Sequence, residues 1–168
     1  MSDFAIRPAT IADAASIVAI YNDYIATTTI SFEEQPVSEV DMAGRIGDVL
    51  DAGLPWLVAE HAGATVGYAY ATKWRARPAY RFSVESTVYL APTACGRGWG
   101  ASLYRRLLEQ LRENGLRTVI AGIAQPNARS VGLHERLGFR KVAHFSDVGF
   151  KFDGWIDVGY WQLNLANA

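Results

Sequence analysis

The apolar residues of this chain repeat with two different periods. Four stretches carry them at the 3.6-residue spacing of an amphipathic helix, and residues that favour helix ends, such as Ser38 and Gly115, stand at their boundaries. In the second of these helices, Val40, Ile46 and Val49 are the predicted buried side. The four predicted helices span about 10–25, 38–52, 95–114 and 127–138.

Seven further stretches either alternate apolar and polar residues or are short runs of β-branched and aromatic residues between turn residues. Both patterns are typical of strands. The predicted strands span 4–8, 56–61, 66–74, 82–90, 117–123, 139–149 and 155–165. The resulting order is βααβββαβαββ, and no linker-like stretch interrupts it. The sequence therefore predicts one domain over residues 1–168, with a mixed α/β (α+β) fold in which helices cover a sheet.

Composition narrows the class of protein. The 168 residues carry 16 basic and 17 acidic side chains, a net charge of −1, which argues against a general nucleic-acid binder or a binder of anionic membranes. One cysteine and three histidines make a metal site improbable. No signal core and no run of about 18 apolar residues is present, so a cytoplasmic location is expected.

A glycine-rich turn, CGRGWG, joins the strand at 82–90 to the third helix. Gly96, Gly98 and Gly100 alternate there, which lets the backbone approach a ligand closely. The first amides of the helix have no internal partners, and the helix dipole favours an anion. Arg97 adds a positive charge. The spacing fits neither a P-loop nor GxGxxG. On these residues alone, a phosphate cradle and a plain tight turn both stay open.

Two segments resemble a known superfamily. TVYLAPTACGRGWGASLYRRLL looks like motif A, and PNARSVGLHERLGF like motif B, of the GNAT acetyl-CoA-dependent N-acetyltransferases. WRARPAY followed by ESTVYL, and GFKFDGWIDVGYWQL, are similar to the phosphinothricin and methionine sulfone or sulfoximine acetyltransferase branch. The resemblance implies a mostly antiparallel sheet of about seven strands with about four helices, two central strands splayed to admit acetyl-CoA, and a homodimer.

The resemblance also implies how acetyl-CoA is held. The amides of the glycine-rich turn would bind the pyrophosphate, the strand edge at 88–90 would pair with the pantetheine arm, and Asn127 would hydrogen-bond that arm. Cys95 departs from the Gln or Arg usual at the start of the loop. For Asn127, a plain N-cap role stays open beside the ligand role. The predicted cofactor residues are Val88, Tyr89, Leu90, Gly96, Arg97, Gly98, Trp99, Gly100, Ala101, Asn127 and Ser130.

Two residues are candidates for proton transfer. Glu85 sits within a predicted central strand, where a carboxylate is costly unless it is paired or functional, and it could take the proton from the attacking amine. A solvated edge strand is the alternative. His134 stands where many GNAT enzymes have the tyrosine that protonates the leaving sulfur. A core histidine bound to a backbone carbonyl is equally compatible with its position.

Three cations, Lys73, Arg75 and Arg77, stand at the end of one strand and in the loop beyond it. They suit a small amino-acid-like acceptor with anionic groups, such as a carboxylate plus a phosphinate or sulfone oxygen. A solvated basic loop is the alternative on charge alone. The resemblance places the acceptor at this loop, next to residues 85–87. The predicted acceptor residues are Phe32, Lys73, Arg75, Ala76, Arg77, Glu85, Ser86, Thr87, Phe150 and Lys151.

The sequence leaves three alternative functions for this chain. The favoured one is acetylation of the α-amine of a phosphinothricin, methionine sulfone or methionine sulfoximine analogue. The second keeps the fold but acetylates a protein N-terminus, a lysine or a polyamine. The third is a non-catalytic CoA-binding module, against which the presence of Glu85 and His134 argues.

Overall fold

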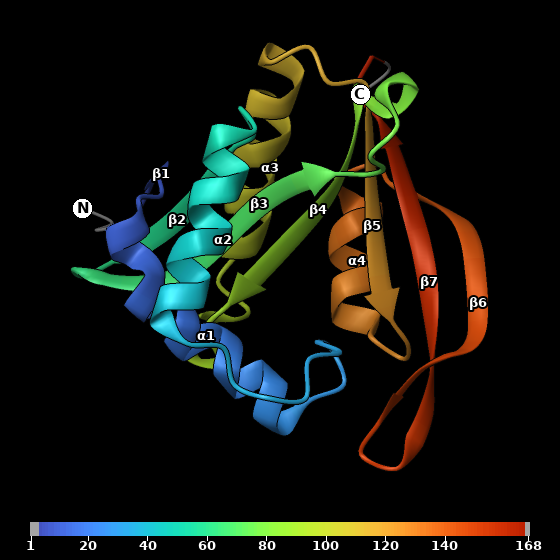
Figure 1. The fold of residues 1–168 in the computed structure, drawn as a ribbon, viewed down its shortest axis with the longest axis horizontal. Helices are drawn as coiled ribbons and strands as arrows, with labels where there is room; N and C mark the ends of the chain where they lie inside the picture. The colour runs from blue at the N-terminus through green and yellow to red at the C-terminus, as the bar shows by residue number, and fades with distance from the viewer. Residues whose placement is uncertain (1–3, 167–168) are drawn as a thin grey trace.

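In the computed structural model, which describes residues 4–166, seven strands form one twisted sheet (Figure 1). They are β1 (Phe4–Pro8), β2 (Trp56–His61), β3 (Ala64–Lys73), β4 (Ser83–Leu90), β5 (Thr118–Ala124), β6 (Arg140–Lys151) and β7 (Gly154–Asn164). Their order across the sheet is β1-β2-β3-β4-β5-β7-β6. Every neighbouring pair is antiparallel except β4 and β5, which are parallel. The predicted mixed, mostly antiparallel sheet is confirmed.

Helices cover both faces of this sheet. Two of them, α1 (Ala14–Thr27) and α2 (Glu39–Asp51), lie on one face, and α3 (Trp99–Glu113) and α4 (Ala128–Arg136) lie on the other (Figure 1). Three short 3-10 turns complete the elements: η1 (Ile11–Asp13), η2 (Pro78–Tyr80) and η3 (Pro92–Ala94). No helix among residues 4–166 is long and apolar enough to cross a membrane.

The buried side of α2 differs from the prediction at one residue. Val40 is 81% exposed, whereas Met42, Ile46 and Val49 are buried. The buried residues follow one another at spacings of four and three, which places them on one helix face. Val40 lies six residues before Ile46, well off that face, in the turn that Ser38 caps by accepting a hydrogen bond from Asp41.

The single parallel pairing is short. β4 and β5 pair only from Ser83 with Thr118 to Glu85 with Ile120. Beyond that point β4 continues to Leu90 and β5 to Ala124 without pairing with each other, and α4 lies next to the gap between them (Figure 1). The predicted splay of the two central strands is therefore confirmed. It leaves one edge of β4 free in the middle of the sheet.

Candidate active site

Two adjoining cavities lie where β4 and β5 diverge. The larger has a volume of about 280 Å³ and reaches from the splay to the glycine-rich turn. The smaller, of about 100 Å³, lies between the two strands themselves. The two share part of their lining, so they form one channel from the turn to the centre of the sheet. The shared residues are Ile30, Val88, Tyr89, Asn127 and Ser130.

The backbone hydrogen-bonding groups of successive β4 residues point alternately toward the two neighbouring strands, β3 and β5. The Phe82 carbonyl accepts the amide of Arg117, which leads into β5, at 2.9 Å. The Ser83 carbonyl accepts the amide of Trp74, on the β3 side, at 3.2 Å. Backbone groups of successive strand residues point to opposite sides. Even-numbered residues of β4 therefore turn their backbone groups toward β5, and beyond Glu85 toward the free edge.

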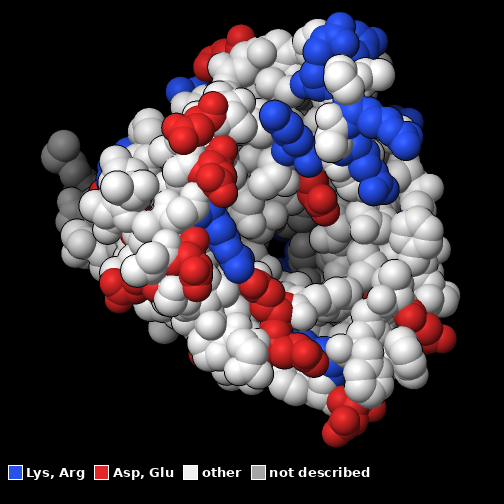
Figure 2. Space-filling view, in the orientation of Figure 1, with Lys and Arg blue, Asp and Glu red and all other residues white. Residues whose placement is uncertain are grey.

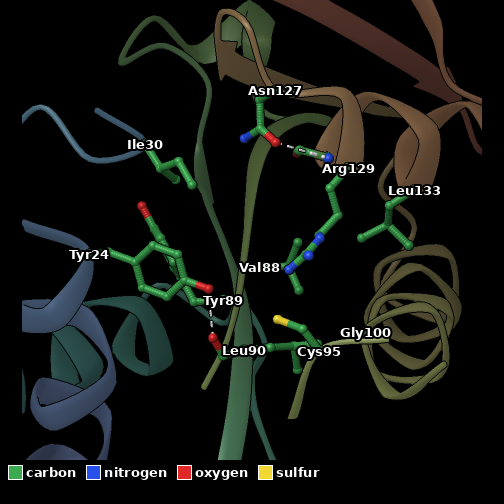
Figure 3. A pocket seen from close by; sticks show the side chains of 11 residues that line it. Tyr24, Ile30, Val88, Tyr89, Leu90, Cys95, Gly100, Asn127, Arg129 and Leu133 are labelled. Carbon is green, nitrogen blue, oxygen red and sulfur yellow. Dashed lines mark hydrogen bonds between the residues drawn. The ribbon is translucent and has the colours of Figure 1, made fainter. Parts of the chain in front are cut away.

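This alternation divides the three predicted pantetheine residues. Val88 and Leu90 present their backbone groups at the free edge. Tyr89 turns its backbone toward β3, where it pairs with Tyr68, so it can contribute its ring but not its amide. The Leu90 carbonyl already accepts the Tyr24 hydroxyl at 2.7 Å (Figure 3). The free edge thus offers both groups of Val88 and the amide of Leu90.

The glycine-rich turn has the backbone conformation that its sequence suggests. Gly96 and Gly98 have φ angles of 82° and 80°, in the left-handed region that favours glycine. Gly98 caps α3, and its carbonyl accepts the Ser102 amide at 3.2 Å. The amides of residues 99–101 precede that bond and remain available to an anion. Gly100 packs closely on Leu90: a Cβ atom there would lie 3.1 Å from its Cδ1 atom.

Two predicted cofactor residues of the turn use their side chains elsewhere. The Trp99 ring stacks on Phe4 with ring centroids 5.2 Å apart, and it also contacts His61 at 4.6 Å. The Arg97 guanidinium lies 5.0 Å from the Trp99 ring centroid. Only their backbone amides, and not these side chains, are left to face the predicted cradle.

Arg129 is a cavity residue that the sequence reasoning missed. It extends from the first turn of α4 into the larger cavity, toward Val88 and Cys95 (Figure 3). Among the described residues, no hydrogen bond or ion pair to its guanidinium is found. A cation in the first turn of a helix is unfavourable because it opposes the helix dipole. The presence of an arginine at this position was therefore a sequence signal that could have identified Arg129.

Asn127 can fill both roles that were left open for it. Its Oδ1 atom accepts the Ser130 amide at 3.1 Å, which makes it the N-cap of α4. Its Nδ2 atom remains as a donor toward the cavity (Figure 3). Ser130 lines both cavities, as predicted for a cofactor residue.

Glu85 lies at the last paired rung between β4 and β5, so its strand is central and the solvated-edge alternative is wrong. The carboxylate is half-buried. Burial raises its pKa, and the charge of Arg75 partly opposes that rise. A Cβ atom at Gly122 would lie 3.5 Å from Glu85 Oε1 and 3.2 Å from the Tyr160 ring. The absence of a side chain at Gly122 therefore leaves room between the carboxylate and the tyrosine.

His134 is 3% exposed and lines the smaller cavity. Its Nδ1 atom lies 2.7 Å from the Ser130 carbonyl oxygen, and its ring contacts Tyr104 and Phe139 edge-on at 5.0 and 5.1 Å. A carbonyl only accepts, so Nδ1 carries the proton. Burial lowers the pKa of His134, with the Ser130 bond opposing it. A neutral ring protonated at Nδ1 has no proton at Nε2 to donate, so this geometry favours the core role.

The predicted acceptor residues of β3 and β4 do not all face one way. Thr72 pairs with Glu85 and Tyr70 with Thr87, so these side chains share a face. Lys73 pairs with Val84 on the opposite face, away from Glu85. Ser86 also lies on that opposite face, where its hydroxyl is 2.5 Å from the Tyr104 hydroxyl. The prediction for these two side chains is therefore not supported, although Ser86 does line the smaller cavity.

The basic loop of the prediction follows β3 and runs into η2. Arg75 lies over the Trp74 ring at 4.8 Å, and its charge reaches Glu85. Ala76 and Arg77 are exposed. Figure 2 shows basic side chains gathered at this end of the molecule, above a hollow in the face that α1 and α2 cover, with acidic side chains on the opposite rim.

Residues 149–151 and Phe32 lie together, but their side chains are arranged differently from the acceptor-binding group that the sequence predicted. A Cβ atom at Gly149 would contact the ring of Phe32 directly. Phe150 is 52% exposed and packs edge-on against Trp155. Lys151 is buried and donates to three backbone carbonyls, so its ammonium is not available to a substrate.

Tyr24 and Ile30 are cavity residues that the sequence prediction did not include, and Tyr160, which lines neither cavity, lies near Glu85. Tyr24 belongs to α1 and Ile30 to the loop after it, and both line the larger cavity. Tyr160 is on β7, opposite Gly122. Only the strand register places Tyr160 beside Glu85, and no spacing in the sequence carried that information.

Comparison with known proteins agrees with this geometry. The family model described as "Acetyltransferase (GNAT) domain" matches residues 6–159. The phosphinothricin N-acetyltransferase of Alcaligenes faecalis is 46% identical over 91% of this chain and 78% of its own length. The L-methionine sulfoximine/L-methionine sulfone acetyltransferase of Pseudomonas aeruginosa is 40% identical over 95% of this chain and 94% of its own.

Among solved structures, a GNAT phosphinothricin acetyltransferase from Sinorhizobium meliloti, in complex with acetyl-CoA, superposes with a TM-score of 0.92. It is 37% identical and covers 96% of this chain and 88% of its own. The chain therefore belongs to the GNAT family of acetyltransferases. It is an acetyl-CoA-dependent N-acetyltransferase.

Proposed function

We propose that this enzyme transfers the acetyl group of acetyl-CoA to the α-amine of a small amino-acid analogue of the phosphinothricin, methionine sulfone or methionine sulfoximine type. The observation that carries the proposal is the Glu85 carboxylate beside Arg75 and Tyr160, at the point where the channel reaches the centre of the sheet. The named activities of the relatives from Alcaligenes and Pseudomonas support this acceptor class.

In the proposed arrangement, acetyl-CoA lies in the channel. Its pyrophosphate meets the free amides of residues 96–101, and Arg129 adds the one positive side chain of the larger cavity's lining. The pantetheine arm pairs with the free edge at Val88 and Leu90, and the Asn127 amide group donates to it. Acetyl-CoA then supplies the activated thioester, and the residues of this chain orient it and exclude water.

Glu85 is the proposed general base. It takes one proton from the acceptor ammonium, directly or through a water molecule, so that the nitrogen has a free electron pair. The nitrogen forms a bond to the thioester carbon, and the carbon–sulfur bond breaks with its electron pair on the sulfur. The second proton, which the nitrogen loses as it becomes an amide, ends on the departing thiolate. The raised pKa of Glu85 suits this step because a base with a pKa closer to neutrality accepts protons more readily. Arg75 would hold an anionic group of the acceptor.

The acceptor class is tested by incubating the enzyme with acetyl-CoA and a panel of amines while free thiol is measured. Phosphinothricin, methionine sulfone and methionine sulfoximine are expected to be turned over well above the hydrolysis background. Spermidine, a short N-acetylated peptide with one lysine side chain, and a short peptide with a free N-terminus serve as comparison acceptors. A kcat/KM for any of those that equals or exceeds the analogues would overturn the acceptor assignment.

We further propose that the enzyme is a homodimer formed through the β6–β7 hairpin. Six large apolar side chains of this hairpin are 51–67% exposed, and an apolar surface of that kind favours association. They are Val142, Phe145, Val148, Phe150, Phe152 and Trp155. Light scattering is expected to give a dimer mass for the wild type and a monomer mass for Trp155→Asp. A monomeric wild type would contradict the proposal.

The cytoplasmic location expected from the sequence stays a prediction.

A further inference from the structure

The Lys151 side chain is buried, and it has no counter-ion in contact with it among the described residues. Its residue exposure is 3%, and no carboxylate of the described residues lies within ion-pair distance of its ammonium. Burial lowers its pKa, and the charges of Glu34 and Glu33 oppose that. A buried cation without a counter-ion is costly, so the bonds it does make need a physical reason.

All three protons of the ammonium are used on one short segment. Nζ donates to the carbonyls of Ile25 at 2.8 Å, Thr28 at 2.9 Å and Ser31 at 2.7 Å. Ile25 is in the last turn of α1, and Thr28 is its C-cap. Carbonyls at a helix C-terminus lack partners within the helix and attract a cation. Lys151 therefore caps α1 from a strand that lies more than 100 residues further along the chain, and it also binds the loop beyond the helix.

The same end of β6 contacts this loop a second time. Phe32 lies against Gly149, where any side chain would collide with its ring. The loop contains no regular secondary structure between α1 and α2. Tyr21 and Arg45 also hold it, through Ser31 at 2.9 Å and Glu33 at 2.6 Å respectively.

Ile30 is the residue that these contacts position. It lies between the two carbonyls that Lys151 binds beyond the helix, and it lines both cavities of the channel. In Figure 3 its side chain lies across the channel from Asn127. A shift of the loop would therefore change the width of the channel along both cavities.

We propose that Lys151 is a positioning residue that fixes the loop of residues 28–32 as a wall of the acceptor site, with Gly149 providing the seat for Phe32. This inference rests on the proposed placement of the amine beside Glu85. The C-terminal hairpin, which contributes no base to the reaction, then sets how well the acceptor binds. Acetyl-CoA is expected to depend less on this loop, because the turn of residues 96–101, the free edge of β4 and Asn127, which make its proposed contacts, do not belong to the loop.

The test compares Lys151→Met and Gly149→Ala with Lys141→Met, which removes an exposed lysine from the same strand. The first two are expected to raise KM for the acceptor by about tenfold or more, because small misplacements cost large factors. Their KM for acetyl-CoA is expected to stay within about threefold of wild type. Lys141→Met is expected to change neither. Gly149→Ala keeps the test valid if Lys151→Met fails to fold, since the 43% exposed Phe32 ring can swing outward.

Amide hydrogen exchange of residues 25–34, measured without any acceptor, gives a second readout. Faster exchange in this segment for Lys151→Met, but not for Lys141→Met, is expected. If the wild type acetylates none of the amines yet this exchange pattern appears, the acceptor assignment fails and the positioning role stands. Equal loss of kcat with all substrates at unchanged acceptor KM, or unchanged exchange, would overturn the positioning role.

Discussion

The Nδ1 atom of His134 lies 2.7 Å from the backbone oxygen of Ser130, and this contact decides what the histidine can do. Because Nδ1 carries the proton, Nε2 carries a lone pair. His134→Asn keeps a donor close to the Nδ1 position, so kcat is expected to fall by no more than about threefold. The lost ring contacts are expected to lower the free energy of unfolding by about 1–3 kcal/mol, measured by urea denaturation.

The pH profile separates the two roles of His134. A general acid at this position would give kcat an alkaline limb that His134→Asn abolishes. We expect the alkaline side of the kcat profile to be the same in both proteins. A kcat reduced by about a hundredfold together with loss of that limb would restore the general-acid assignment.

Glu85→Gln is expected to lower kcat by about a hundredfold or more, while the dissociation constant of acetyl-CoA changes by less than about threefold. The reason is that the amide keeps the shape of the side chain but cannot take a proton. Steady-state kinetics and isothermal titration with acetyl-CoA, without an acceptor, measure the two quantities. Equal weakening of binding would show that Glu85 supports the cofactor site instead.

The raised pKa of Glu85 also has a consequence for stability. The folded state holds this proton more tightly than the unfolded state does, so the stability it contributes is present at low pH and lost as the pH rises above the ordinary value of 4.5. Glu85→Gln is therefore expected to melt at a higher temperature than wild type at pH 8 and at nearly the same temperature at pH 4. A reversed order of the melting temperatures would contradict the raised pKa.

Gly98→Ala and Gly115→Ala form a matched pair for the cradle. Both glycines have φ close to 80°, and nothing lies within 4 Å of an added Cβ atom at either. Each substitution is expected to cost about 1 kcal/mol of stability, through the same backbone strain. Only Gly98→Ala is expected to weaken acetyl-CoA binding, by about tenfold, because only Gly98 begins the anion-binding end of α3. Equal affinity in the two variants would argue against the cradle.

Arg129→Gln is expected to raise KM for acetyl-CoA by about tenfold, since a cation facing a diphosphate contributes a charge-assisted hydrogen bond. S-acetylpantetheine lacks the diphosphate, so its KM is expected to be equal in the variant and the wild type. The exposed Arg105 of α3 does not line the cavity, and Arg105→Gln is the control. A similar loss with both thioesters would place Arg129 on the pantetheine arm instead.

Local pattern and resemblance predicted most of the architecture. The periods located every strand and helix, and the turn residues located most of their ends. The error at Val40 came from treating apolar character as burial, although the register of the helix decides which residues face the sheet. The backbone conformation of the glycine-rich turn was predictable because glycine conformation and helix polarity are local properties.

The rest of the site depended on long-range placement. Tyr160 faces Glu85 only through pairing of β5 with β7, and Lys73 turns away only through its pairing with Val84. Lys151 looked like a cation for the substrate, yet its partners lie 120 to 126 residues earlier in the chain. Such contacts leave no periodic signal within a sequence window.

The short parallel pairing of β4 with β5 has a final consequence. Only the rungs from Ser83 to Glu85 join the four N-terminal strands to the three C-terminal ones within the sheet, and the cavities continue along the same line. The proposed reaction centre thus coincides with the seam of the fold. The pantetheine arm of acetyl-CoA, paired along Val88, would extend the hydrogen-bonded ladder across that seam. The two halves of the enzyme would therefore be joined most firmly while acetyl-CoA is bound.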